Sequence, residues 1–290
     1  MWVGLRHSRR IGRILMRIDQ GIIRPDDAVS EGRSDRLPPP FEPLFLGDWV
    51  DAVFIHYEVD AKVLQTEVPF ELDLWEGRAF VSLVAFTMRR LRPRSGGRLA
   101  EALFKPLACT GYLNVRTYTR HRTEPGIYFI AEFVSNPLCV PLGRPSFGLP
   151  YRSGHLVYQH DHAGGGIEGA VRAAGERGRL AYRARLASSA GFQACRPGTL
   201  DAFLLERYTA FTGAGNKRRL FHVWHPPWLQ APLEIVVEDE GLLATIGGWA
   251  SHAHLVGANF SPGVHDVGMG WPRRIRWPGP RRRLTVFFDD

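Results

Sequence analysis

The sequence predicts a mainly β, α+β fold in which one mixed sheet forms a barrel-like domain. The first observation is that many segments alternate between apolar and polar residues with a period of two, the pattern of half-buried strands. The second is that Gly, Pro, Asn and Asp separate these segments into hairpins. The third is that few segments show helical spacing. With 290 residues, of which 44% are hydrophobic, the chain can bury the core of one large domain.

The charge distribution divides the chain into a central domain and two basic ends. Residues 1–40 hold 8 Arg and 5 acidic residues, and the last residues are again rich in Arg. We therefore expect a flexible N-terminal extension over residues 1–40, a folded domain over residues 41–273 and a basic tail over residues 274–290. The central domain holds nearly equal numbers of basic and acidic residues, so it lacks the footprint of a nucleic-acid-binding protein.

The first third of the domain predicts a strand, a capped helix and a hairpin. Asp60 is placed to cap the helix, because an Asp side chain accepts hydrogen bonds from the free N–H groups of a first turn. The predicted elements are, in order, a strand at Asp51–Val59, a helix ending at Glu67, a hairpin of Leu72–Trp75 and Arg78–Met88 turning at Glu76-Gly77, and a basic loop at Arg89–Arg98.

The central segment predicts a second hairpin followed by a short helix. Tyr112–Thr119 alternates strictly, and Glu124-Pro125-Gly126 has the residues of a tight turn before a partner strand at Ile127–Val134. Ser135-Asn136-Pro137 offers a capping side chain and a Pro suited to a first helical turn. The helix is expected to lead into a loop that reaches Arg152.

The last third predicts further strands around one longer helix. Pro197-Gly198-Thr199 supplies a turn and a cap before apolar residues at helical spacing. The predicted elements are strands at Ser153–His160, Ile167–Ala173 and Leu180–Leu186, a helix at Leu200–Phe211, and short β-rich or apolar segments at Leu220–Trp224, Leu233–Val237, Leu242–Ile246 and His252–Ala258.

Arg116 is the leading candidate for a binding residue. Period-two geometry places it on the same strand face as Tyr112, Asn114 and Tyr118, where its guanidinium needs hydrogen-bond acceptors. Two interpretations remain open: an ion pair with Glu132 of the neighbouring strand, or recognition of an anion inside a cavity.

Cofactor and metal chemistry has weaker support. His160-Asp161-His162 and His252-Ala253-His254 each place two rings on one strand face, but no third ligand stands at a diagnostic spacing. The three cysteines form no C-x-x-C pair, so neither a zinc knuckle nor a disulfide framework is indicated, and a reducing cytoplasm fits best. We expect no cofactor and no membrane span.

The sequence also resembles a known group, the bacterial YqjF-like family of unknown function. The similar blocks are Asn114–Tyr118, Gly126–Phe129, Gly143-Arg144 with Leu149-Pro150-Tyr151, Glu206-Arg207-Tyr208, His225–Trp228 and Asn259–Val264, in the same order. The resemblance covers roughly residues 47–272. It implies the acetoacetate-decarboxylase-like fold, a mixed, cone-like β-barrel with a few helices and an interior cavity.

The resemblance also exposes a difference in chemistry. Where the decarboxylase has the two lysines that form and activate its Schiff base, this sequence has Tyr151 and Arg152, and where relatives often have a Glu it has Tyr112. An Arg does not serve as a neutral amine near pH 7. Decarboxylation through an iminium is therefore not expected.

The favoured function is binding of a small organic acid or carbonyl compound in the barrel cavity. Any reaction would be of a lyase or hydratase type on a small keto or hydroxy acid, with Tyr118 and Tyr151 as candidate proton donors. The alternative is a non-catalytic interaction or scaffold protein whose basic ends attach it to an anionic surface, a membrane or a nucleic acid. The candidate ligand-binding residues are Arg116, Asn114, Tyr112, Glu132, Arg144, Arg152 and His56.

Overall fold

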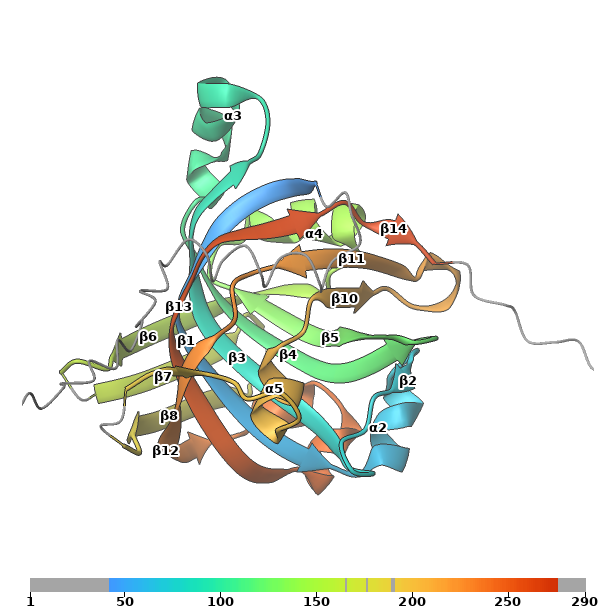
Figure 1. Cartoon of the computed structure of the whole chain (residues 1–290), viewed down its shortest axis with the longest axis vertical. Coiled ribbons are helices and arrows are strands. Elements are labelled where there is room, and N and C mark those ends of the chain that lie inside the picture. Colours follow the sequence, from blue (N-terminus) through green and yellow to red (C-terminus); the bar gives the residue numbers. More distant parts are fainter. Residues whose placement is uncertain (1–41, 165, 176, 189–190, 276–290) are drawn as a thin grey trace, which may run out of the picture.

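The computed structural model describes residues 42–275, except residues 165, 176, 189 and 190. The expected N-terminal extension lies outside these residues, as does the expected C-terminal tail from residue 276 on. A few short helices are interspersed among the strands (Figure 1). The strands are β1 (Pro43–Val59), β2 (Glu71–Leu72), β3 (Ala79–Pro93), β4 (Thr110–His121), β5 (Glu124–Val134), β6 (Tyr151–Asp161), β7 (Gly166–Ala173), β8 (Arg179–Leu186), β9 (Gln193–Ala194), β10 (Thr209–Thr212), β11 (Arg219–Trp224), β12 (Leu229–Asp239), β13 (His254–Gly270) and β14 (Arg273–Arg274).

The helices are short and lie at the ends or on one face of the sheet. They are α2 (Ala61–Glu67), α3 (Gly97–Phe104), α4 (Cys139–Phe147) and α5 (Leu200–Leu205), with 3₁₀ turns η1 (Lys105–Leu107), η2 (Gly215–Lys217), η3 (Leu243–Thr245) and η4 (Gly248–His252). None of the helices in the described part of the chain is long and apolar enough to cross a bilayer.

Nine strands of the described chain close into a mixed β-barrel. Their order is β5-β6-β7-β8-β12-β13-β1-β3-β4, and β4 pairs back with β5. Most neighbours are antiparallel, but β5 and β6 run parallel. The predicted mainly β, α+β fold with a barrel-like sheet is confirmed.

The five strands β13, β1, β3, β4 and β5 are covered on both faces. Alternate residues of β1 divide between two cores: Val53 and Ile55 pack inside the nine-strand barrel, whereas Ala52 and Phe54 pack on the opposite face. On that opposite face β10 pairs with β5 and β11 pairs with β13, so these two strands form a second cover over the same five strands. The second core therefore lies between the shared sheet and β10, β11 and the helices beside them.

Several predicted elements are confirmed with small shifts in their ends. Asp60 caps α2 by accepting hydrogen bonds from the backbone N–H groups of Lys62 and Val63, at 2.7 and 2.9 Å. The three predicted strands in residues 153–186 correspond to β6, β7 and β8. The basic segment after Met88 is not a loop in its first half, because β3 continues to Pro93.

The turn of the central hairpin was placed wrongly. The reversal occurs at Arg122-Thr123, where Arg122 has φ +58°, and Glu124-Pro125-Gly126 already belongs to β5. Gly126 is needed for a different reason: a Cβ atom there would stand 2.5 Å from the carbonyl oxygen of Thr209. Its missing side chain lets β10 lie directly beside β5.

The predicted helix over residues 200–211 is correct only in its first half. Thr199 caps α5, which ends at Leu205, and residues 209–212 form strand β10. Parallel pairing of β10 with β5 buries Ala210 and Phe211 completely, so tertiary contacts override the helical spacing. Residues 242–246, expected to be β-rich or apolar, contain the 3₁₀ turn η3. The hairpin at Glu76-Gly77 forms only the bridge between Trp75 and Arg78, because β2 pairs with β4.

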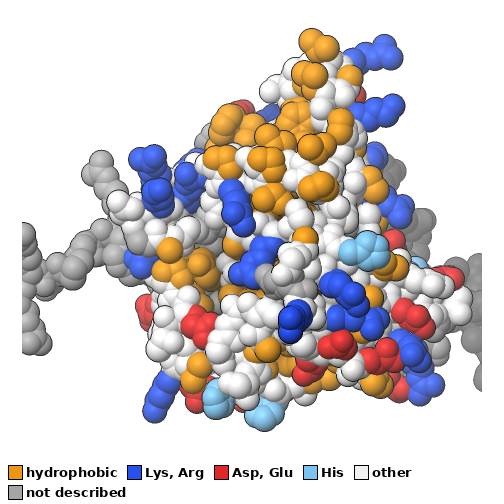
Figure 2. All heavy atoms as spheres, turned by 180° about the vertical axis from the view of Figure 1, so that it is seen from behind, with side chains coloured by type: hydrophobic (Ala, Val, Ile, Leu, Met, Phe, Trp, Pro, Cys, Tyr) orange, Lys and Arg blue, Asp and Glu red, His pale blue; other side chains and the backbone are white. Residues whose placement is uncertain are grey.

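One end of the molecule carries an exposed apolar surface. Helix α3 projects from the body, and hydrophobic side chains gather on it and on the adjoining part of the body (Figures 1 and 2). The exposed large apolar residues on α3, α4 and the segment just before α4 are Leu99, Leu103, Leu138 and Leu142.

Candidate functional site

A cavity of about 320 Å³ lies in the second core, between the shared sheet and its second cover. Its walls come from β1, β3, β4, β5, β6, β10, β11, β13, α3, η1 and α4, and most lining side chains are apolar or aromatic. A few polar groups converge in it, which is the usual composition of a ligand site. These groups are Tyr112, Asn114, Arg116, Glu132, Cys139, Ser146, Tyr151, Arg207, Thr209 and His225.

Strand β4 supplies the central row of polar residues. Tyr112, Asn114 and Arg116 point to the same face because they alternate with Leu113 and Val115, which lie in the barrel core. All three line the cavity, as the sequence predicted for this face.

Arg116 is buried and lacks a carboxylate partner. Its Nη2 donates a hydrogen bond to the carbonyl oxygen of Leu204 at 2.9 Å, and its guanidinium carbon lies 5.7 Å from the ring centroid of Phe54. Its Nε has no hydrogen-bond partner among the described residues. The ion pair with Glu132 considered above is not formed: Glu132 lies opposite Asn114, and Arg116, beyond a register shift, lies opposite Phe129.

The charge of Arg116 acts on its basic neighbours. Burial lowers the pKa of His56 to about 3, and the positive charge of Arg116 contributes to this decrease. Burial also lowers the pKa of His225, again with a contribution from Arg116, although Glu206 opposes it. Since a guanidinium stays protonated at neutral pH, this end of the cavity holds a buried cation that the neighbouring side chains do not neutralise.

Arg207 is a second guanidinium at the same end. Its Nη1 lies 2.7 Å from Oδ2 of Asp73, and its guanidinium carbon lies 4.1 Å from the ring centroid of Phe203. Its Nε donates to the carbonyl oxygen of Phe203 at 2.7 Å. Because Asp73 neutralises Arg207, Arg116 is the cation of this pair that is available to an anionic ligand.

Glu132 forms a separate acidic group in the middle of the cavity. The side chain is 3% exposed, its Oε2 has no hydrogen-bond partner in the described chain, and burial raises its pKa well above the ordinary range. Burial thus favours the protonated form, in which the carboxyl group is a hydrogen-bond donor. The Oδ1 atom of Asn114, directly opposite on β4, is also buried without a partner.

Tyr151 stands beside Glu132, because β5 and β6 pair these two residues. Its ring lies edge-on to that of Tyr112, with centroids 6.0 Å apart. Burial raises the pKa of Tyr151 well above 10, and its neighbours Tyr112 and Glu132 add to this. Tyr151, Glu132 and Asn114 thus form a row across three neighbouring strands, and each can exchange hydrogen bonds with a ligand.

His56 and Tyr118 lie behind the cavity rather than on its wall. His56 shares hydrogen bonds with Ser82 Oγ at 2.7 Å and with Asn259 Oδ1 at 3.1 Å. Ser82 in turn contacts the Tyr118 hydroxyl at 2.6 Å, and Tyr118 donates to the same Leu204 carbonyl that accepts from Arg116. His56 and Tyr118 are thus linked by buried hydrogen bonds to the carbonyl group that holds Arg116, and neither lines the cavity.

Arg144 and Arg152 are also outside the cavity wall. Arg144 is exposed on α4, and its Nε donates to the backbone carbonyl of Tyr151 at 3.0 Å. The side chain of Arg152 lies over the ring of Phe133, which belongs to the barrel core on the other face of the sheet. Of the predicted site residues, the cavity brings together Tyr112, Asn114, Arg116, Glu132 and Tyr151.

Sequence reasoning missed the lining residues that come from β10, β11 and their connections. Arg207, His225 and Trp228 are buried in the site, and the ring of His225 lies 5.2 Å from that of Trp228. These residues occur in two of the blocks that resemble the YqjF-like family, Glu206-Arg207-Tyr208 and His225–Trp228. Their position in these blocks was the sequence signal that could have identified them as site residues.

The lysines and the possible metal ligands can be located relative to the cavity within the described residues. Lys62, Lys105 and Lys217 are all exposed, and none lines it. Within the described residues no group of three or more His, Cys, Asp or Glu side chains is arranged to hold a metal ion. His160 is instead bonded through both ring nitrogens, to the Asp51 carbonyl at 2.6 Å and to the Tyr182 hydroxyl at 2.8 Å.

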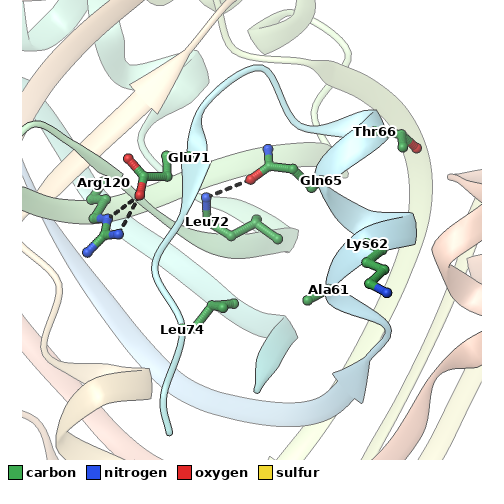
Figure 3. Close-up of a pocket in the computed structure, with 8 residues that line it drawn as sticks. All are labelled: Ala61, Lys62, Gln65, Thr66, Glu71, Leu72, Leu74 and Arg120. Carbon is green, nitrogen blue, oxygen red and sulfur yellow. Dashed lines mark hydrogen bonds and ion pairs between the residues drawn. The ribbon is translucent and has the colours of Figure 1, made fainter. Parts of the chain in front are cut away.

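A second hollow, of about 580 Å³, is open to solvent between α2 and β2 (Figure 3). Its polar side chains are bonded to the protein itself: Arg120 pairs with Glu71, and Gln65 accepts from the backbone N–H of Leu72 at 3.1 Å. The amide of Gln65 also donates to the carbonyl oxygen of Phe70 at 2.8 Å. These contacts hold the segment that links α2 to β3, so we assign this hollow a structural role.

Comparison with known proteins agrees with this architecture. The family model DUF2071, described as an uncharacterized conserved protein, matches residues 47–265. The uncharacterized protein YqjF of Bacillus subtilis (strain 168) is 32% identical over 183 residues, which are 62% of this chain and 72% of YqjF.

Solved structures show the same fold at low sequence identity. Acetoacetate decarboxylase from Legionella pneumophila aligns with a TM-score of 0.54 and 12% identity, over 86% of this chain and 95% of the decarboxylase. The enduracididine biosynthesis enzyme MppR, complexed with the condensation product of pyruvate and imidazole 4-carboxaldehyde, aligns with a TM-score of 0.55 and 15% identity, over 84% and 92% of the two chains. The expected resemblance to YqjF-like proteins is thus confirmed. The fold is that of acetoacetate-decarboxylase-like proteins, and the chain belongs to the DUF2071 family.

Proposed function

We propose that the protein binds a small organic acid or carbonyl compound in the cavity on the second face of the shared sheet. The observation that carries this proposal is the buried guanidinium of Arg116, which lines the cavity and has no carboxylate partner among the described residues. A buried cation is costly unless an anion or a strong dipole compensates it. A carboxylate or carbonyl oxygen at Nε supplies that compensation.

The remaining polar groups suit an oxygen-rich ligand. Burial favours the protonated form of Glu132, and Tyr151 has a hydroxyl group, so both can donate hydrogen bonds to a carbonyl or hydroxyl oxygen. Asn114 Oδ1 accepts from a ligand hydroxyl or N–H group. Pyruvate, the precursor of the compound bound to the structurally similar MppR, has two of these oxygen functions, a carboxylate and a carbonyl.

Any reaction in the cavity would draw its proton from Tyr151 or Glu132. Both are acids on its wall whose pKa is raised by burial, whereas the hydroxyl of Tyr118 is already donated to Leu204. This assignment retains Tyr151 as the candidate proton donor and transfers Tyr118 to a supporting role.

The proposal is tested by thermal-shift titration with a panel of keto and hydroxy acids. Arg116→Met removes the charge and keeps the aliphatic stem, and Arg116→Lys keeps a charge, so that a loss of folding and a loss of binding are separated by the two unliganded melting temperatures. Arg120→Ala is the matched control, because Arg120 lies on the same strand but lines the open hollow beside α2.

The expected result is a ligand-induced increase in melting temperature for native protein and Arg120→Ala, a smaller one for Arg116→Lys and none for Arg116→Met. Equal increases in native protein and Arg116→Met contradict the proposal. If the ligand-induced increase in melting temperature is lost only in Arg120→Ala, the proposal is also contradicted, because the ligand then binds in the hollow beside α2.

A further inference from the structure

The cavity has a polar half and an apolar half. Apart from Cys139 and Ser146 of α4, the lining residues toward α3 and α4 carry no polar side chain, and they come from six separate elements. These residues are Leu44 and Phe45 of β1, Met88 and Leu91 of β3, Phe104 of α3, Leu107 of η1, Leu142 and Phe147 of α4, and Met269 of β13. Such a wall offers dispersion contacts and no hydrogen bonds.

The two halves lie one after the other along strand β4. Arg116, Asn114 and Tyr112 follow each other on one face, and four residues of extended strand, at about 3.3 Å each, separate Arg116 from Tyr112 by roughly 13 Å. Met88 pairs with Thr110, two residues further along β4. The apolar half therefore extends the cavity beyond Tyr112, away from Arg116.

The apolar half is also the end that reaches solvent. Arg116 is 6% exposed, whereas Leu142 on α4 is 54% exposed and Phe104 and Leu107 are half-buried. The apolar surface of α3 and the adjoining body continues outward from this end (Figure 2). A ligand whose polar group lies at Arg116 therefore has its other end directed along an apolar passage toward α3 and α4.

A compact acid leaves this passage empty. At about 30 Å³ for each water-sized atom group, a volume of 320 Å³ holds roughly ten such groups. Pyruvate has six heavy atoms, and its polar atoms are all drawn to the polar half. Its complex would leave the aromatic and aliphatic side chains near the mouth without partner atoms, which loses their dispersion contacts.

We propose that the ligand is a carboxylic acid with an apolar chain, whose carboxylate lies at Arg116 and whose chain runs past Tyr112 along the apolar wall toward Phe104 and Leu142. The proposal rests on the proposed function, because it keeps the anion at Arg116, and it adds the class of acid that fills the cavity. An oxygen substituent near the carboxylate would lie at Asn114, Glu132 and Tyr151.

The test is a homologous series of straight-chain acids, butanoate, hexanoate and octanoate, measured by isothermal titration calorimetry on the full chain below the micelle concentration. Burial of one methylene group is worth about 0.8 kcal/mol, so Kd is expected to fall by about fourfold for each added methylene until the passage is full. A Kd that stays constant or rises with chain length overturns the proposal.

Two neighbouring residues of α3 provide matched variants. Phe104 lines the cavity, whereas Leu103 is 72% exposed and does not line it. Phe104→Ala is expected to weaken octanoate binding by roughly tenfold and butanoate binding by less than about twofold, and Leu103→Ala to change neither. Equal effects of the two variants on octanoate also overturn the proposal.

Arg116→Met separates this proposal from the one on which it rests. Loss of binding of every acid in Arg116→Met, with no dependence on chain length in the native protein, supports the anion site and contradicts the apolar chain. Binding that strengthens with chain length but is equal in native protein and Arg116→Met contradicts the anion site, and with it the placement of the carboxylate. The expected result is chain-length dependence that requires Arg116.

Discussion

The ring of Tyr151 lies directly against the backbone of Gly143, so closely that a Cβ atom on Gly143 would stand 2.2 Å from Cε2 of the ring. The next residue, Arg144, donates a hydrogen bond from Nε to the carbonyl oxygen of Tyr151. The Gly-Arg segment of α4 therefore fixes both the side chain and the backbone of Tyr151. Gly143 and Arg144 therefore position Tyr151, and this role does not require Arg144 to contact a ligand.

Gly143→Ala is expected to destabilise the protein by about 1–3 kcal/mol and to weaken ligand binding, because the added methyl group displaces the Tyr151 ring. Alanine is otherwise favoured over glycine in a helix by up to about 1 kcal/mol, so a net loss reports the clash. Urea unfolding of the variant measures it. Gly257→Ala is the control, since a Cβ atom there meets no heavy atom within 4 Å, and equal losses in both variants would contradict this account.

Glu132→Gln is expected to stabilise the protein relative to the native chain increasingly as the pH rises. Burial raises the pKa of Glu132 in the folded state, so above the ordinary value of 4.5 the unfolded chain releases a proton that the folded chain keeps. The stability of the native protein then falls with rising pH, by up to about 1.4 kcal/mol per pH unit, and glutamine does not titrate.

Urea unfolding of native protein and Glu132→Gln at pH 4.5, 6 and 8 measures this difference. Glu76→Gln, in the exposed turn between Trp75 and Arg78, is the control for the loss of a surface carboxylate. A difference between native protein and Glu132→Gln that does not change with pH would show that Glu132 is solvated or paired in the folded state.

His56→Gln is expected to flatten the loss of stability in acid. Burial, helped by Arg116, lowers the pKa of His56 from 6.5 to about 3 in the folded state. Between these two pH values the unfolded chain binds a proton that the folded chain does not bind. The free energy of unfolding of the native protein therefore falls by about 1.4 kcal/mol for each pH unit of decrease. Removing the imidazole should reduce the slope by one proton between pH 6 and 4.

The comparison of slopes, rather than of absolute stabilities, tests this expectation, because glutamine also changes the hydrogen bonds to Ser82 and Asn259. His254→Gln, at an exposed position of β13, is the matched control. Parallel pH profiles for native protein and His56→Gln would contradict the assignment of a buried neutral imidazole.

Period-two alternation was enough to predict the polar face of β4, but not its partners. Tyr112, Asn114 and Arg116 lie together in the cavity because side chains of a strand alternate between faces. The register that places Glu132 opposite Asn114, and the shift after Val115 that places Arg116 opposite Phe129, have no sequence signal of their own. The alternation therefore predicts which residues share a face and not which residues pair across strands.

The missing half of the site has the same physical origin. Arg207 and Thr209 were assigned to a helix because residues 200–211 show helical spacing, whereas pairing of β10 with β5 turns the chain into a strand at Thr209. That pairing requires the bare backbone of Gly126, which lies 83 residues before Thr209 in the chain. Contacts between such distant segments form only in the closed sheet, so local secondary-structure propensity does not predict them.

The last prediction concerns the amine chemistry of the structurally similar decarboxylases. A lysine that forms a Schiff base must be neutral, which takes burial or an adjacent cation to lower its pKa from about 10.4. Lys62 and Lys105 are exposed, and Lys217, beside Arg218 and Arg219, is exposed at the end of η2. At this exposed position solvent screens the repulsion between Lys217 and its two arginine neighbours.

We therefore expect no covalent adduct when the protein is treated with borohydride in the presence of acetoacetate or pyruvate, and an intact mass equal to that of untreated protein. An acetoacetate decarboxylase treated in parallel is the positive control. The same acids should still raise the melting temperature through Arg116, so the two experiments together distinguish binding from iminium chemistry. A stoichiometric adduct that maps to one of the three lysines would contradict the prediction, because it would require that lysine to reach the bound acid from outside the cavity wall.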